Sequence, residues 1–505
     1  MVTCWLSGTG NILAAAALSS CLAVMSMGAA ARSEEIRRLV DAAPVAAPEL
    51  AADILIRIAE SPRVAEPGWK LELLDQAFHM AGGSKYETAL DAALGAATDT
   101  DSDSGVRIVA LRAHLDALSL RCRALTATLS LNHKKALELF REIPTARFPQ
   151  HQCEDATTEA PRTFFETLAL LVEQAFTAEE RAKGKHIDFA EEYLRGLTSP
   201  TQLVPAIRMV VALKVRRDDF ARLAGALVGS MQQMNSDDRT FSAVTGVELV
   251  SEVATFAAEC RQHQYSLQAP IAGFRAYLVR HFEAPRCAES GDQGNRSTIR
   301  LVDSFNKTLL PLAGEGAVSP VTSDEMKPVS VGARAAVYLF WSKPASRRLM
   351  ADYKHLRFGT EEQQAANKLK ARRSDGMAQF LTVEQRSTPE WQAAAQEYLT
   401  ELEEWKKDND EPAESYFHEV CFLYHGLLDI VPGGSLREHV LNSYIDFLKN
   451  SEVERNSPPE WYMQVSRLMK GSTDASSDEV AHIQNEMRAR GDPVMILLVD
   501  AQRLK

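Results

Sequence analysis

Between Pro161 and Phe282, apolar side chains recur at steps of three and four residues in six successive segments. This spacing places the apolar residues of each segment on one face of an α-helix. Because a helix with one apolar stripe must bury it against a neighbour, we expect the six helices to stack on one another. The stripes consist of Phe164, Leu168, Leu171 and Ala175; Ile187, Ala190, Leu194 and Leu197; Leu203, Ile207 and Val210; Phe220, Leu223, Leu227 and Met231; Val250, Val253, Ala257 and Cys260; and Ile271, Phe274, Leu278 and Phe282.

Local start signals accompany two of these helices. Thr177 with Glu180 three residues later fits a capping box, in which each side chain binds the backbone N–H of the other residue. Ser199 and Gln202 have the same spacing, and Pro200 stands at the first helical position, where its missing N–H costs little. Two helices in roughly 40 residues is the period of HEAT-like and TPR-like arrays. The sequence therefore predicts an all-α fold of stacked helical hairpins, an α-solenoid.

The length of the chain predicts more than one packed unit. A chain of 505 residues exceeds one ordinary hydrophobic core, so two or three units are expected. A long polar stretch that carries several glycines and prolines, residues 287–331, is interpreted as a linker with one short helix from Ile299 to Leu310. The predicted division is a signal peptide at 1–31, an N-terminal helical unit at 32–150, a central array at 151–286, the linker at 287–331 and a C-terminal helical domain at 332–505.

Helical patterns also occupy the two outer units. They are predicted at Glu34–Asp41, Pro48–Glu60, Trp69–Met80, a hairpin from Leu111 to Phe140, Glu361–Arg372, Glu390–Lys406, Ala413–Ile430, Leu436–Asn450 and Glu460–Met469, with a final helix or strand at Val494–Val499. Three of them open on a Pro-x-Trp unit, at Trp69, Trp391 and Trp461. Proline suits the first turn of a helix, and the repetition indicates either duplicated building blocks or simply a favourable helix start.

The N-terminal segment is typical of an exported protein. Residues 1–31 contain no Asp, Glu, Lys or Arg, and an apolar, alanine-rich run from Ile12 to Ala31 ends at Arg32. Small residues at Ala29 and Ala31 fit a signal-peptide cleavage site, which predicts a periplasmic or extracellular protein. Two alternatives stay open: the run is nearly long enough for a membrane anchor, and the four residues ending at Cys21 resemble a lipobox. Contact with a membrane is expected only in those two cases.

Seven cysteines are present, and removal of the signal peptide would leave five. Cys153 and Cys287 lie in polar loops on either side of the central helices, so they are the candidate disulfide. Cys122, Cys260 and Cys421 fall within helical patterns, where a buried thiol is the usual interpretation.

Charge limits the kinds of partner. The formal net charge of −12 argues against a nucleic-acid-binding surface. The segment 341–373 is locally basic, and Arg347, Arg348, Arg372 and Arg373 form a candidate surface for an anionic partner. The segment 397–414 is acidic, so solvated helix faces or attraction between the two segments are the simpler interpretations.

The most chemically reactive residues lie between 414 and 425. His418, Cys421 and His425 share one helical face and could ligate a metal with a fourth ligand, although the zincin motif would need His where Phe422 stands. Glu414-Ser415 resembles the catalytic pair of lytic transglycosylases, but the accompanying motifs of those enzymes are missing. A buried mixed helix face and a carboxylate in the first helical turn explain these residues more simply. We therefore predict no catalytic residues, no metal and no cofactor.

Several short segments resemble large exported bacterial proteins that are entirely helical. They are Phe140–Pro144, Glu192–Arg195, Phe274–His281, Leu356–Gly359 and Thr388–Trp391. The resemblance covers most of the mature chain, implies export and a helical fold, and carries no activity or functional residue with it. The predicted function is that of an exported scaffold or protein-binding module with an unidentified protein partner. The alternative is a cell-envelope enzyme, such as a glycan-active hydrolase or lyase.

Overall fold

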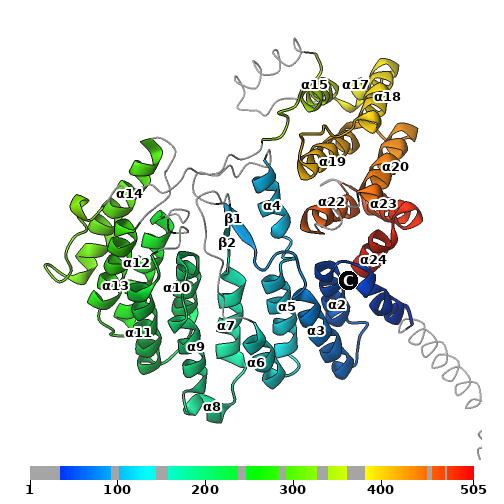
Figure 1. Cartoon of the computed structure of the whole chain (residues 1–505). Coiled ribbons are helices and arrows are strands. Elements are labelled where there is room, and N and C mark those ends of the chain that lie inside the picture. The colour runs from blue at the N-terminus through cyan, green and yellow to red at the C-terminus, as the bar shows by residue number, and fades with distance from the viewer. Residues whose placement is uncertain are drawn as a thin grey trace, which may run out of the picture.

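The computed structural model describes residues 34–92, 102–143, 157–236, 241, 246–284, 292–326, 339–360, 381–451, 458–471 and 475–504. Helices dominate this part of the chain (Figure 1), which confirms the all-α fold. Two strands of three residues, β1 (Leu90–Ala92) and β2 (Thr157–Glu159), pair antiparallel and were not expected from the sequence. They fasten the N-terminal helices to the start of the central array.

The N-terminal helices form successive packed pairs. A helix at 34–42 precedes η1 (Ala43–Val45), α2 (Pro48–Glu60), α3 (Pro67–Ala81), α4 (Asp103–Leu111), α5 (Ala117–Leu129) and α6 (His133–Glu142). The hairpin predicted from Leu111 starts later, because Leu111 ends α4 and the Asp116 carboxylate caps α5 by accepting a hydrogen bond from Ser119 N at 2.8 Å. α3 packs against both α2 and α5, and α5 packs against α6.

The central array consists of α7 (Arg162–Gln174), α8 (Ala178–Ala182), α9 (Lys185–Arg195), η2 (Pro200–Gln202), α10 (Leu203–Ala212), α11 (Arg217–Gln233), α12 (Gly246–Gln262) and α13 (Gln268–Glu283). Every residue of the six predicted stripes is at most 6% exposed, so the stripes are the core of the array. Both predicted capping boxes are present, at Thr177 with Glu180 and at Ser199 with Gln202.

Residues 292–326 continue this array. α14 (Asp292–Ser304) passes into a π-helical turn (Phe305–Leu309) and a 3-10 turn (Leu310–Ala313), and it packs against α12. The amide of Asn306 exchanges two hydrogen bonds with the backbone of Val321, and Arg275 of α13 forms an ion pair with Glu325 at 2.7 Å. Much of the stretch interpreted as a linker is thus ordered helical structure attached to α12 and α13.

The C-terminal helices are α15 (Pro344–Phe358), α17 (Val383–Arg386), α18 (Pro389–Glu404), α19 (Ala413–Ile430), α20 (Ser435–Asn450), α22 (Pro458–Lys470), α23 (Ser477–Arg490) and α24 (Pro493–Gln502). α19 has the predicted bounds, the tail at 494–499 is helical, and α23 was not predicted. The helix expected at Glu361–Arg372 lies outside the described residues.

The C-terminal helices join the N-terminal ones. α24 packs against α2, and α22 packs against α4 (Figure 1). From α2, the Arg57 guanidinium donates hydrogen bonds to Tyr462 of α22 at 2.7 Å and to Gln502 of α24 at 2.8 Å. The hydroxyl of Ser61 also donates to the carbonyl of Leu504 at 3.1 Å. The C-terminal helices therefore extend the helical array beyond α2. Both ends of the described chain lie inside the array and not at its tips.

Two of the three Pro-x-Trp units share one structural role. The indole N–H of Trp391, at the start of α18, donates to the carbonyl of Leu356 in α15 at 3.0 Å. The indole N–H of Trp461, at the start of α22, donates to the carbonyl of Leu448 in α20, also at 3.0 Å. Each indole thus satisfies a carbonyl in the last turn of an earlier helix, where no intrahelical donor exists. Trp69 is half-buried against the core.

Candidate functional site

Buried polar side chains of α19 include Ser415, His418, Glu419 and His425, and the two histidines line different cavities. His418 is 5% exposed and lines a cavity of about 130 Å³ together with Phe340, Trp341 and Arg467. His425 is 7% exposed and lines a larger cavity of about 440 Å³. The two rings are two helical turns apart, so the shared face predicted from their spacing does not bring them to one site.

The metal hypothesis for this face gains no support from the geometry. Within the part of the chain that the structure describes, no group of three His, Cys, Asp or Glu side chains is placed to hold a metal ion. Cys421, Cys122 and Cys260 are buried and form no disulfide with a described residue, which confirms the expected buried state of all three. The face is therefore a packed helix surface with polar groups that open into two separate cavities.

Burial keeps both histidines neutral. It lowers the pKa of His418 to about 3, with a smaller contribution from the positive charge of Arg107. Burial likewise lowers the pKa of His425 to about 3, and the positive charge of Arg467 adds to the effect. One ring nitrogen of each residue, Nδ1 of His418 and Nε2 of His425, has no hydrogen-bond partner among the residues that the structure describes.

These pKa values predict a loss of stability in weak acid. The ordinary pKa of an unfolded histidine is about 6.5. Below that pH, the unfolded chain takes up protons that the folded chain, with pKa values of about 3 for His418 and His425, does not. The free energy of unfolding should then fall by up to about 1.4 kcal/mol per pH unit for each histidine as the pH decreases from about 6.5 towards 3.

Denaturant titrations between about pH 7.5 and about pH 4.5, an interval that brackets the ordinary histidine pKa, would measure this loss of stability. Replacement of both His418 and His425 by glutamine should flatten the dependence on pH. The control is His439→Gln, because the His439 side chain is 47% exposed and lies 3.3 Å from the Glu403 carboxylate. An unchanged slope in the double variant would contradict the assignment.

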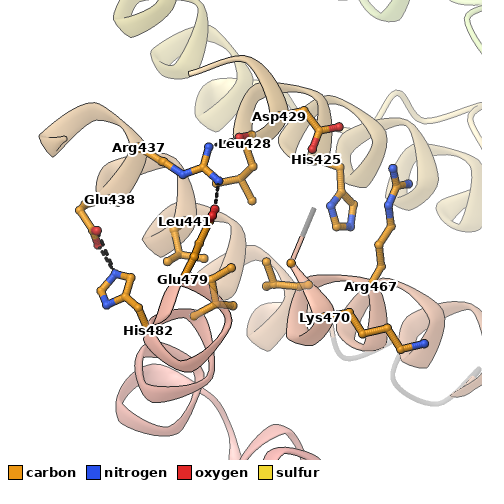
Figure 2. A pocket seen from close by; sticks show the side chains of 13 residues that line it. His425, Leu428, Asp429, Arg437, Glu438, Leu441, Arg467, Lys470, Glu479 and His482 are labelled. Atoms are coloured by element: carbon orange, nitrogen blue, oxygen red, sulfur yellow. Dashed lines mark hydrogen bonds and ion pairs between the residues drawn. The ribbon is translucent and has the colours of Figure 1, made fainter. Parts of the chain in front are cut away.

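The larger cavity lies among four helices of the C-terminal unit, α19, α20, α22 and α23 (Figure 2). Its apolar wall is formed by Leu428, Leu441, Leu468 and Ile483. Its polar residues include two pairs that join α20 to α23: Glu438 accepts a hydrogen bond from the ring of His482 at 2.9 Å, and Arg437 forms an ion pair with Glu479. These two pairs give a partner to four of the charged or titratable side chains that line the cavity.

Three charged groups of the cavity are left outside these pairs. Arg467 and Lys470 are three residues apart on α22, and neither forms a hydrogen bond or ion pair with a described residue. Figure 2 shows Arg467 extending towards the end of the cavity where His425 and Asp429 lie. Burial raises the pKa of Asp429, although the positive charge of Arg467 acts in the opposite direction. The unpaired charges of the cavity are therefore two positive and one negative.

The basic surface predicted on α15 is partly neutralised. Arg348 forms an ion pair with Glu401 of α18 at 2.9 Å, and Lys343 pairs with Asp410, so attraction between the basic and acidic segments is observed. Arg347 is exposed, and its Nε donates a hydrogen bond to the carbonyl of Lys343 at 3.5 Å. Arg372 and Arg373 lie outside the described residues. The anionic-partner surface at these four arginines stays a prediction.

Glu414 has a structural partner. Its carboxylate accepts a hydrogen bond from the Arg107 guanidinium at 2.7 Å, and Arg107 also lies 3.6 Å from Glu460. This cluster ties α19 and α22 to α4 at the joint between the C-terminal and N-terminal helices. The hydrogen bond from Arg107 gives Glu414 a structural role that does not require catalysis. Cys153 and Cys287 lie outside the described residues, so the candidate disulfide also stays a prediction.

Comparison of the chain with known protein families and with curated proteins found no match. Among the described residues, no helix has both the length and the apolar character required to cross a membrane. The residues of the larger cavity escaped the sequence analysis because they come from four separate helices, one of which, α23, was not predicted. The only available signal was the histidine at 425, on the helical face already singled out.

Proposed function

We propose that this chain is an exported scaffold that binds another protein through the exposed surface of its helical array. The observation that carries the proposal is the docking of α24 on α2, which lengthens the array instead of leaving two separate helical units. In Figure 1, α14 lies at one end of this array and the α15–α18 region lies at the other. Extended arrays of this kind offer long continuous surfaces, which are suited to another macromolecule.

Export rests on the N-terminal sequence, because residues 1–31 lie outside the described part of the chain. A net charge of −12 favours a protein partner over a nucleic acid. On α15, Arg348 forms an ion pair with Glu401, whereas Arg347 is exposed without a carboxylate partner among the described residues, which leaves a positive charge on this face of an otherwise acidic chain. We therefore place the first contact with the partner on the α15 face, near the end of the array.

Crosslinking in the envelope fraction of the native host tests this proposal. The wild-type chain should recover one partner reproducibly, and reversing the charge of Arg347 and Arg348 to glutamate should weaken recovery. Added salt should have the same effect, because exposed charges are screened within about 8 Å at physiological ionic strength. Arg162→Glu is the matched control: Arg162 is 69% exposed and paired with Glu166, whereas Arg348 is 68% exposed and paired with Glu401.

Two outcomes would count against a scaffold. Equal loss of capture in Arg162→Glu and in the α15 variants would show that the α15 face has no special part in binding. A glycan-cleaving activity that disappears in Glu414→Gln, with folding and partner capture intact, would favour the envelope enzyme instead. The scaffold proposal expects Glu414→Gln to affect stability only, through its contact with Arg107.

A further inference from the structure

We infer that the cavity between α19, α20, α22 and α23 binds a small organic anion. The carboxylate or phosphate head of this anion lies beside Arg467, and the apolar body of the anion lies against the leucine-rich wall of the cavity. This inference does not depend on a protein partner. It rests on three features of the cavity: the unpaired cations, the unsatisfied histidine nitrogen, and the division of the lining into a polar and an apolar part.

The cations of α22 are available to a ligand. Arg467 and Lys470 both line the cavity and are neighbours on one face of α22. In Figure 2 the Arg467 side chain extends towards His425, whereas the Lys470 side chain extends along α22 away from it. Arg437, the third cation of the lining, is already held by Glu479 and by the carbonyl of Val431. A guanidinium presents several N–H groups in a plane, a geometry that matches the oxygens of a carboxylate or phosphate.

The histidine of α19 supplies a second, independent observation. His425 is 7% exposed, lines the cavity, and has no hydrogen-bond partner at Nε2 among the described residues. Buried polar atoms in folded proteins almost always have a partner, so an unsatisfied nitrogen in the wall of a cavity indicates a group that the ligand completes. In the tautomer that carries the proton on Nε2, a neutral imidazole would donate to an anionic oxygen.

Charge and volume narrow the class of ligand. Outside the two pairs, the cations Arg467 and Lys470 outnumber the single carboxylate of Asp429, which suits an anionic head group. Leu428, Leu441, Leu468 and Ile483 provide an apolar surface for the rest of the molecule. A volume of about 440 Å³ lies within the usual range of small-molecule sites. The ligand is therefore a small amphiphilic anion.

Calorimetric titration of the full chain tests this inference with three probes that share an aromatic body. Phenylacetate carries a carboxylate, phenyl phosphate carries a phosphate, and phenylacetamide is a neutral counterpart of the first. At least one of the two anions should bind saturably, and the amide should bind about tenfold or more weakly, since charge-assisted hydrogen bonds are lost. The anion that binds more tightly identifies the head group.

Matched variants locate the binding. Arg467→Gln should weaken binding of the anion about tenfold or more, whereas Arg162→Gln, which removes the same charge from the exposed surface of α7 outside the cavity, should leave it unchanged. Circular dichroism checks the folding of each variant, and Lys470→Gln, an exposed substitution, serves if Arg467→Gln does not fold. The inference is overturned if neither anion binds at millimolar concentration, if the amide binds equally well, or if Arg162→Gln weakens binding as much as the cavity variants.

Discussion

Truncation after Asp492 is expected to unfold the chain, although it removes only the last 13 residues of 505. C-terminal tails are usually dispensable because they lie at the edge of a fold. Here the tail forms α24, which lies between α2 and α23 within the array. Its buried side chains are Val494, Met495, Leu497, Leu498, Val499, Ala501 and Leu504. Each large one contributes about 1.5–3 kcal/mol, and their sum, on the order of 10 kcal/mol, matches the whole stability of a typical domain.

Circular dichroism and limited proteolysis of the truncated chain measure this effect. A milder pair of variants controls for the truncation itself. Met495→Ala, at a fully buried position, should lower the free energy of unfolding by about 2–5 kcal/mol. Ile496→Ala, one residue further along the same helix and only half-buried, should cost clearly less. A truncated chain that still unfolded cooperatively at the wild-type midpoint would show that α24 is not part of the core.

The joint between α2, α22 and α24 explains why the expected loss is so large. Asp53 is buried and accepts hydrogen bonds from Arg57 at 2.7 Å and from Arg123 at 2.5 Å, while Arg57 also reaches Tyr462 and Gln502. Removal of α24 would leave the Arg57 guanidinium short of one acceptor and expose the apolar side of α2. Polar and apolar contacts are therefore lost together at a single point of the array.

The helices of this fold were predictable because their signals are local. Apolar residues at steps of three and four defined the six central stripes, and all of these residues are buried. The capping boxes at Thr177 and Ser199 needed only residues three positions apart. α19 was predicted with its observed bounds because an apolar periodic pattern runs without interruption from Ala413 to Ile430. Such features depend on the chain's own backbone geometry and need no knowledge of distant partners.

The joint and the cavity were not predictable, because they depend on residues far apart in the sequence. Arg57 meets Gln502 across more than 400 positions, and nothing in either local pattern indicates the other. α23 was missed because only two of its apolar side chains, Ile483 and Met487, are buried, so its periodic signal is weak. With α23 missing, the fourth wall of the cavity and the pair of His482 with Glu438 could not be foreseen.

Trp461→Ala is expected to destabilise the chain by about 3–5 kcal/mol, the range for removal of a large aromatic side chain from a core. Trp461 is fully buried, and its indole N–H satisfies the carbonyl of Leu448 at the end of α20. The substitution therefore leaves a cavity and an unsatisfied acceptor in the same place. Denaturant unfolding followed by circular dichroism gives the change in free energy.

Trp461→Phe separates the two contributions, because phenylalanine fills much of the volume but cannot donate the hydrogen bond to Leu448. It should cost about 1–3 kcal/mol, the penalty for a buried acceptor left without its donor. The same substitution at Trp391, 8% exposed and bonded to Leu356, should cost a similar amount, whereas Trp69→Phe should cost least, since Trp69 is only half-buried. If Trp69→Phe were as damaging as Trp461→Phe, the indole-to-carbonyl bond would not be the feature that gives the Pro-x-Trp unit its structural value. If the predicted order holds, the bond between one helix start and an earlier helix end is what gives the unit its structural value at Trp391 and Trp461.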